Sequence, residues 1–263
     1  MTTPIEPTQH QLGPVKVTER PLLCSDEEIR AVLSGKKTQF RRVSHSSLVE
    51  DRQGRPWPSE GPRSRLLGTP AEEEQRKQRI AQELLDSCPW GAPGDRLWLR
   101  ERWRSEDVKC DAQDDDSHLC DAHCFQTFIH YAATPRIGLR ARPDRARITY
   151  LDESSPIPAT PSFHWRKASV MPRFASRVTL ELVSRRIERL QAVTEDDAKA
   201  EGHPIDTEPC DHVRARCDDV GCMGQTHRSS FAAAWGADSQ TKRQNDVWGT
   251  NPWVWRLEVR RID

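Results

Sequence analysis

The chain has 263 residues, and its 40 Lys and Arg residues balance its 40 Asp and Glu residues, so the formal net charge is zero. This balance excludes a protein that coats nucleic acid through a global positive field, although it is compatible with a local basic patch. Only 35% of the residues are hydrophobic and 19 are prolines, which predicts a modest core with long polar excursions. No apolar run approaches the ~20 residues of a membrane-spanning helix, and the N-terminus lacks a signal-peptide pattern. We therefore expect a cytoplasmic protein with no membrane partner.

The first predicted unit is a strand followed by a short helix. Pro21–Leu23 has the apolar character of a strand. Ser25 lies three residues before Glu28, which is the spacing of a capping box, so a helix is predicted to begin there. Gly35 supplies the stop signal of this helix. A basic loop is predicted to run from Gly35 to Arg42.

The later elements are predicted from apolar periodicity. Helices are predicted over 71–86, 194–202 and 231–235, and strands over 96–103, 128–133, 177–183 and 252–262. Short helices between several strands indicate an α+β protein built on a small mixed β-barrel. We expect a loose tail over 1–19 and one domain over 20–263, with insertions at about 44–86, 104–127 and 203–228.

Five motifs occur in order along the chain. They are Gly35–Arg42, Cys88–Gly91, Pro93–Glu101, Met171–Arg177 and Asn251–Trp255. The first resembles the opening of an ASCH domain, and the later ones are similar to ASCH-like proteins encoded by tailed phages and prophages. The resemblance implies a PUA-like mixed β-barrel whose cleft is bordered by the Gly35–Arg42 loop. If the chain is phage-encoded, its location would be the cytoplasm of the bacterial host.

The resemblance also implies a function class. ASCH proteins are thought to bind RNA or modified bases, one branch removes the acetyl group from N4-acetylcytidine, and another member is described as a ribonuclease. The amidohydrolase branch uses a Lys, a Thr three positions later and a Glu near the end of a later helix. Here the Lys corresponds to Lys37 and the Glu to Glu201, but Phe40 stands at the Thr position. A phenyl ring cannot act as a nucleophile, and Thr38 is the nearby hydroxyl that remains.

The Lys37–Glu201 pair has three interpretations at this point. It can contact a ligand, it can catalyse a hydrolysis, or it can be a surface ion pair at a helix end. In a strand, the side chains of Arg41 and Arg42 diverge, so we expect at most one of them to line the cleft. The residues predicted to contact nucleic acid by charge or stacking are Lys36, Lys37, Phe40, Arg41, Arg42, Trp98 and Arg100, with Trp103 as a further stacking candidate.

Cysteine and histidine gather in two polar segments, and only Cys24 and Cys88 stand apart as expected buried thiols. In a reducing compartment, such clusters favour a metal over disulfides. Structural zinc fits thiolate and imidazole ligands and would fold segments that have no core. Two local sites, one shared site and idle reduced thiols are all compatible with the spacing. The predicted ligands are Cys110, Cys120, His123, Cys124, Cys210, Cys217, Cys222 and His227, with His118 and His212 in the same segments.

Three functions follow from these features. The first is binding of nucleic acid, RNA in particular, or of a modified nucleobase in a cleft around Lys37 and Glu201. The second is a hydrolase, an amidohydrolase or a nuclease acting on modified nucleosides or RNA, that uses the same pair, with Thr38 as a further catalytic candidate. The third is a phage-encoded protein whose Cys/His insertions dock a host protein.

Overall fold

The computed structural model describes residues 17–44, 48–51, 54, 56–58, 69–109, 125–141, 148–150, 165–205, 207, 224–237 and 248–262. The protein is of the α+β class, as the sequence predicted in coarse terms. No helix in these ranges is long and apolar enough to cross a membrane.

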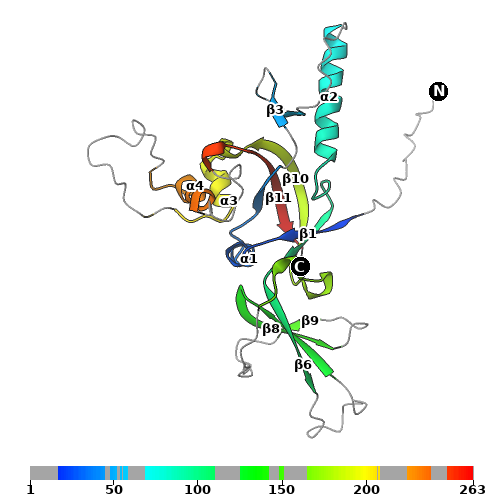
Figure 1. Cartoon of the computed structure of the whole chain (residues 1–263), viewed down its shortest axis with the longest axis vertical. Coiled ribbons are helices and arrows are strands. Elements are labelled where there is room, and N and C mark those ends of the chain that lie inside the picture. The colour runs from blue at the N-terminus through cyan, green and yellow to red at the C-terminus, as the bar shows by residue number, and fades with distance from the viewer. Residues whose placement is uncertain are drawn as a thin grey trace, which may run out of the picture.

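A five-stranded mixed sheet forms the centre of the molecule (Figure 1). Its strands run in the order β1 (Glu19–Leu23), β5 (Arg96–Arg100), β10 (Thr179–Arg189), β11 (Trp253–Arg261) and β2 (Gln39–Val43). β1 is parallel to β5, and every other neighbouring pair is antiparallel. This order places β2, which carries the basic motif, beside the C-terminal strand.

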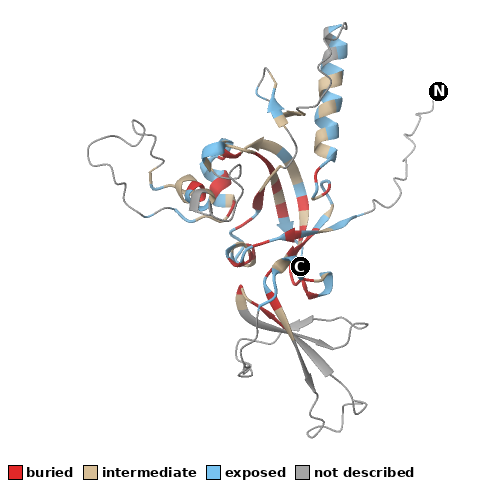
Figure 2. Cartoon of the chain, in the orientation of Figure 1, coloured by how far each residue is buried: buried red, intermediate tan, exposed pale blue. Residues whose placement is uncertain are grey.

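Alternating side chains of this sheet form the main hydrophobic core, because one face of each strand is buried. The almost fully buried residues include Leu97, Leu99, Leu180, Leu182, Leu257 and Val259. Buried segments accordingly concentrate on the central strands in Figure 2. Helix α1 (Asp26–Leu33) adds Ile29 and Val32 to this core.

Capping boxes fix where three helices begin. The Ser25 hydroxyl accepts a hydrogen bond from the Glu28 amide, and the Glu28 carboxylate accepts one from the Ser25 amide, as the spacing predicted. Thr194 and Asp197 make the same reciprocal pair at α3 (Glu195–Ala200). Helix α4 (His227–Ala237) packs against α3 and places Phe231 in a second hydrophobic cluster.

The remaining elements project from the central sheet (Figure 1). An antiparallel sheet contains β6 (Trp103–Lys109), β7 (Phe125–Tyr131), β8 (Thr134–Ala141) and β9 (Ile148–Tyr150). A hairpin of β3 (Leu48–Glu50) and β4 (Pro56–Pro58) precedes the long helix α2 (Pro70–Asp86). Four 3₁₀ turns complete the described elements: η1 (Ala168–Val170), η2 (Arg173–Ala175), η3 (Leu190–Ala192) and η6 (Trp248–Thr250).

Three sequence predictions differ from this arrangement. Residues 39–42 were predicted as loop but lie in β2, because pairing with β11 supplies backbone partners that local sequence does not reveal. The predicted strand over 96–103 is divided, and its last residue begins β6 of the other sheet. Both ends of the predicted insertion at 104–127 also belong to that sheet, which continues over β8 and β9.

A buried ion pair joins the two sheets. Arg177 donates from Nε and Nη2 to the two oxygens of the Glu101 carboxylate, each at 2.8 Å, and both side chains are almost completely buried. Arg177 Nη1 donates to the Thr134 hydroxyl at 2.7 Å, and the guanidinium lies 4.1 Å from the Tyr131 ring centroid. Glu101 follows β5, whereas Thr134 and Tyr131 belong to the second sheet. The pair therefore fixes how the sheets meet.

Replacing Arg177 with Ala should lower the free energy of unfolding by about 3–5 kcal/mol, because the Glu101 carboxylate would stay buried without a partner. Urea denaturation measures the change. The matched control is Arg260→Ala, which breaks the exposed Arg260–Glu181 pair and should cost about 0–1 kcal/mol. Equal losses of unfolding free energy in the two variants would contradict the inference that the Arg177–Glu101 pair fixes how the two sheets meet.

Candidate functional site

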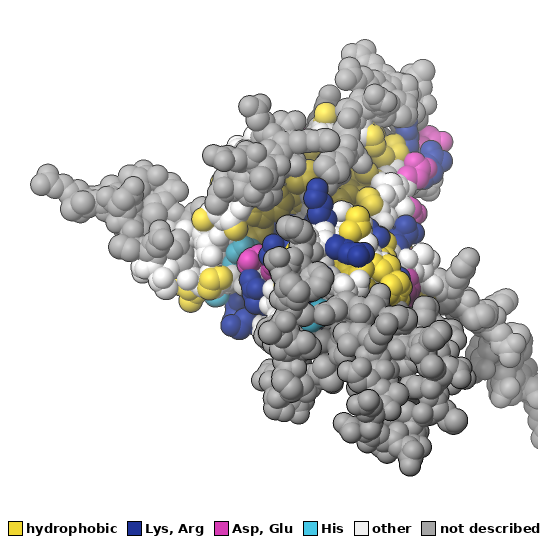
Figure 3. All heavy atoms as spheres, turned by 60° about the horizontal axis from the view of Figure 1, so that its bottom comes forward, with side chains coloured by type: hydrophobic (Ala, Val, Ile, Leu, Met, Phe, Trp, Pro, Cys, Tyr) yellow, Lys and Arg dark blue, Asp and Glu magenta, His cyan; other side chains and the backbone are white. Residues whose placement is uncertain are grey.

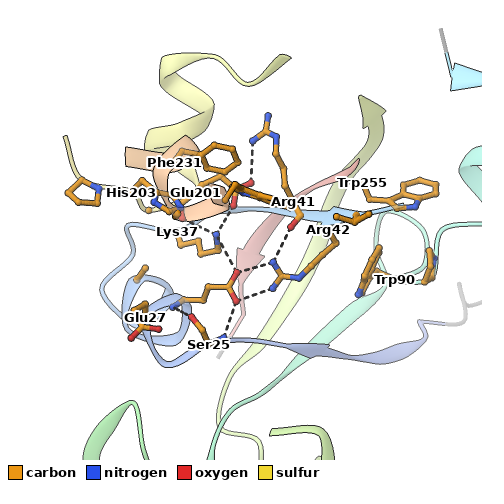
Figure 4. Close-up of a pocket in the computed structure, with 18 of the residues that line it drawn as sticks. Ser25, Glu27, Lys37, Arg41, Arg42, Trp90, Glu201, His203, Phe231 and Trp255 are labelled. Carbon is orange, nitrogen blue, oxygen red and sulfur yellow. Dashed lines mark hydrogen bonds and ion pairs between the residues drawn. The ribbon is translucent and has the colours of Figure 1, made fainter. Parts of the chain in front are cut away.

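A cavity of about 1090 Å³ lies beside the central sheet, between α1, β2 and α4 (Figure 4). Its wall is completed by Ser87, Pro89, Trp90, Trp255 and residues 201–204. Charged side chains from α1, β2 and the end of α3 gather in the middle of this wall, with Phe231 beside Arg41 and with Trp90 and Trp255 beyond Arg42. On the molecular face in Figure 3, hydrophobic side chains lie in a hollow that charged side chains flank.

Lys37 and Glu201 meet in this wall, although 164 residues separate them in the sequence. The Thr38 amide donates to the Ala200 carbonyl at 2.9 Å, which binds the segment after α1 to the end of α3. Lys37 Nζ then donates to Glu201 Oε2 at 2.6 Å and to the Glu201 carbonyl at 2.9 Å. The Lys37 and Glu201 side chains are 2% and 4% exposed, so this is a buried ion pair.

Gly202 allows this close approach. Its φ of +85° lies in the left-handed region that favours glycine. A Cβ atom at this position would lie 3.0 Å from the Ala31 Cβ and 3.2 Å from the Lys37 Cβ. A side chain here would therefore push α3 away from α1 and separate Lys37 from Glu201.

Arg41 binds the other side of the same carboxylate. Its fully buried guanidinium donates from Nη1 to Glu201 Oε1 at 3.2 Å and from Nη2 to Asp197 Oδ2 at 3.1 Å. Nε and Nη2 also donate to Glu188 Oε1, at 3.2 Å and 2.5 Å. Arg256 donates to the second oxygen of Asp197 at 2.8 Å. Arg41 thus connects β2, β10 and α3 through three carboxylates.

Glu28 neutralises the positive charges of the wall next to α1. Arg42 Nη1 and Nη2 donate to its two oxygens at 2.9 Å and 3.1 Å, and Lys37 Nζ lies 3.8 Å from Oε1. Burial alone would raise the pKa of Glu28, but the charges of Arg42 and Lys37 outweigh it and hold the pKa at about 2. Glu28 is therefore an anion at neutral pH. It caps α1 and fixes Arg42 at the same time.

An aromatic wall flanks these charges. Phe231 and Trp235 come from α4, Trp90 follows α2, and Trp255 belongs to β11. The Glu195 carboxylate positions α4 by accepting hydrogen bonds from its first two amides, at 2.7 Å and 3.0 Å. The cavity can therefore hold a planar apolar ring beside fixed donors and acceptors.

His203 is a polar group of the wall that stays neutral. Burial, followed by the positive charge of Lys37, lowers the pKa of His203 to about 4. Its ring meets the Phe231 ring edge-on, with centroids 5.2 Å apart. At neutral pH this imidazole therefore adds no charge to the cavity.

The lowered pKa of His203 should make the protein less stable in acid. Between pH 6.5 and about 4, the unfolded state binds a proton at this position and the folded state does not, so stability falls as the pH falls. His203→Gln should remove this contribution and flatten the dependence. Urea unfolding of both proteins across that interval tests it, and identical slopes would contradict the prediction.

The predicted site residues separate into two groups. The structure brings Lys37, Glu201, Arg41 and Arg42 together in the cavity wall. The expectation that at most one of the two arginines lines the cleft was wrong, because carboxylates on both sides of β2 hold both guanidinium groups beside the cavity.

The other predicted contacts lie outside the cavity lining. Thr38 and Lys36 are exposed, and neither lines the cavity. Phe40 is fully buried in the core, where its ring centroid lies 4.5 Å from Lys37 Nζ. Phe40 was predicted to contact nucleic acid by stacking. Because it is buried beneath the ion pair, it supports the cavity wall instead. Trp98 and Arg100 of β5 stack on each other at 4.7 Å, away from the cavity lining.

Sequence analysis missed three carboxylates of the site, Glu28, Asp197 and Glu188. Glu28 and Asp197 were identified only as helix caps, because a capping box is visible within four residues. Their second role depends on Arg42 and Arg41, which approach from other elements. Glu188 had no local signal at all.

The predicted zinc ligands fall mainly in segments 110–124 and 208–223, outside the described residues. His227 is described, and its Nδ1 lies 2.6 Å from the His203 carbonyl oxygen. Within the described ranges, no group of three or more His, Cys, Asp or Glu side chains can hold a metal ion. Zinc binding and a docking role for the insertions therefore stay predictions. Cys24 and Cys88 are buried free thiols, as expected.

Comparison with known proteins returned no matching family model, no matching curated protein and no matching solved structure. The candidate site is therefore interpreted from its own geometry.

Proposed function

We propose that the cavity binds a nucleobase, either in RNA or as a modified nucleoside. The observation that carries this proposal is that the Lys37–Glu201 pair lines the same cavity as the partly buried rings of Trp90 and Trp235. A base needs a flat apolar surface for its faces and polar groups at its edge. The cavity provides both.

The charge balance of the wall favours a neutral ring over a phosphate as the bound group. Lys37 and Arg41 share Glu201, and Arg42 pairs with Glu28. A phosphate would have to displace these carboxylates, which would then be buried without partners. A base can instead form hydrogen bonds with Lys37 and Glu201 without separating the ion pairs of the wall. Affinity in the cavity should therefore depend little on salt, in contrast to binding through phosphate contacts.

The resemblance to ASCH domains supports the same ligand class. It implies a PUA-like barrel with a base-binding cleft at the Gly35–Arg42 motif, and the cavity wall contains residues of this motif. We propose the PUA-like architecture and a cytoplasmic location together with the base-binding function.

Substitution of Glu201 with Gln tests the proposal. The amide keeps the shape of the side chain but loses the charge-assisted contact with Lys37, so nucleoside affinity should fall about tenfold. Calorimetric titration with a panel of nucleosides that includes N4-acetylcytidine measures the affinity. The matched control is Glu181→Gln on the exposed face of β10, which should leave affinity unchanged. No binding by the wild type, or equal effects of the two substitutions, would contradict the proposal.

Hydrolysis is the second candidate function, and the short Lys37–Glu201 contact favours it. A buried carboxylate 2.6 Å from an ammonium group can accept and return a proton beside a bound ligand. The nucleophile would have to be water, because Phe40 replaces the family threonine and Thr38 lies outside the cavity lining. The Ser25 hydroxyl lines the cavity but is engaged in the cap of α1.

Incubation with N4-acetylcytidine separates binding from hydrolysis. Because no threonine takes the nucleophile's place in the described cavity wall, we expect mass spectrometry to recover the nucleoside with its acetyl group. Release of acetate by the wild type and its loss in Lys37→Met would instead establish the hydrolase.

A further inference from the structure

A second set of cations, Arg166 and Lys167, is exposed and has no carboxylate partner among the described residues. Residues 165–180 contain Arg166, Lys167, Arg173 and Arg177 but no Asp or Glu. Arg177 is neutralised by Glu101 in the joint between the sheets, and Arg173 pairs with Glu19 at 2.8 Å. The charges of Arg166 and Lys167 are left for another partner.

Arg100 extends this set from the end of β5. Its Nη1 donates to the Ser169 carbonyl at 3.1 Å, and its guanidinium lies over the Trp98 ring. Arg166 pairs through its backbone with Trp103 at the start of β6. Across the part of the chain that the structure describes, no carboxylate lies within ion-pairing distance of Arg100, Arg166 or Lys167. This differs sharply from the cavity, where every cation of the Lys37 network has a carboxylate.

Exposed aromatic rings accompany these cations. Trp165, next to Arg166, is 43% exposed, and Phe174 of η2 is 51% exposed. Met171 and Ala175 of the same segment are fully buried and anchor it against the second sheet. The segment is thus held in place by buried residues while it presents aromatic and basic groups outward. We call Arg100, Trp165, Arg166, Lys167 and Phe174 the Arg/Trp surface.

We infer that the Arg/Trp surface binds single-stranded nucleic acid. Its cations would neutralise backbone phosphates and release counterions, and its exposed rings would stack with bases. An acidic peptide would satisfy the charges but offers no flat ring to stack on the exposed faces of Trp165 and Phe174. A duplex would hide the faces of its bases. A flexible single strand offers both phosphates and open base faces, so it fits the whole surface.

This inference does not rest on the ligand of the cavity. The cavity favours a neutral ring, and its affinity should depend little on salt, whereas the Arg/Trp surface binds through counterion release. Oligonucleotide binding and nucleoside binding can therefore succeed or fail separately.

The test is fluorescence anisotropy with labelled single-stranded RNA and DNA of mixed sequence, measured over a series of salt concentrations. The double substitution Arg166→Gln and Lys167→Gln keeps the side-chain stems and removes two charges. It should weaken binding about five- to tenfold and reduce the slope of log affinity against log salt by about 1.4. Trp165→Ala should weaken binding about fivefold or more through lost stacking, with a smaller change in slope.

The matched control is the double substitution Lys36→Gln and Lys199→Gln, which removes two exposed lysines outside this surface. It should leave affinity and slope unchanged. Far-UV circular dichroism checks that each variant is folded.

Three results would overturn the inference. One is absence of oligonucleotide binding by the wild type. Another is a loss in the Lys36/Lys199 variant as large as that in the Arg166/Lys167 variant. The third is binding of polyglutamate, but not of oligonucleotides, that the Arg166/Lys167 substitutions abolish, because this would identify an acidic protein as the partner.

Discussion

Glu201 accepts hydrogen bonds from Lys37 on one oxygen and from Arg41 on the other, in a region that excludes solvent. A buried charge is tolerated only when a partner offsets its lost hydration. Each of these three groups therefore requires the others, and each belongs to a different element. The segment after α1, the strand β2 and the end of α3 must all be in place before any of the charges is satisfied. Gly202 makes the requirement geometrically feasible, because it lets α3 approach Lys37 closely.

The same constraint shapes the chemistry of the cavity. A wall built from paired charges is polar but nearly neutral, and it holds its donors and acceptors in fixed positions. Such a wall discriminates by hydrogen-bond pattern rather than by charge. The aromatic wall, held by the Glu195 cap of α4, completes a slot for a flat ring. Base binding is therefore the function that agrees with both walls.

The Arg/Trp surface has the opposite electrostatic character. Arg166 and Lys167 are exposed and, among the described residues, have no carboxylate partners, so they can exchange solvent and counterions for phosphate at little cost. A chain with zero net charge can thus still present a local basic surface, because no Asp or Glu occurs within residues 165–180. Arg100 was predicted to contact nucleic acid; it lies outside the cavity lining and belongs to the proposed Arg/Trp surface.

Local interactions were predictable from the sequence by itself. The capping boxes of α1 and α3 each join residues three positions apart, so their spacing determines where these helices begin. Apolar alternation likewise located β5, β10 and β11, and the coarse α+β class followed from these elements. Lys37 and Glu201 were both singled out by the resemblance to ASCH domains.

What only the tertiary structure decided was which charges meet: Glu28 and Asp197 are helix caps by sequence, but they are also the partners of Arg42 and Arg41. The physical reason is that strand pairing and burial act between residues far apart in the chain, and these long-range contacts determine which charged side chains lose water together.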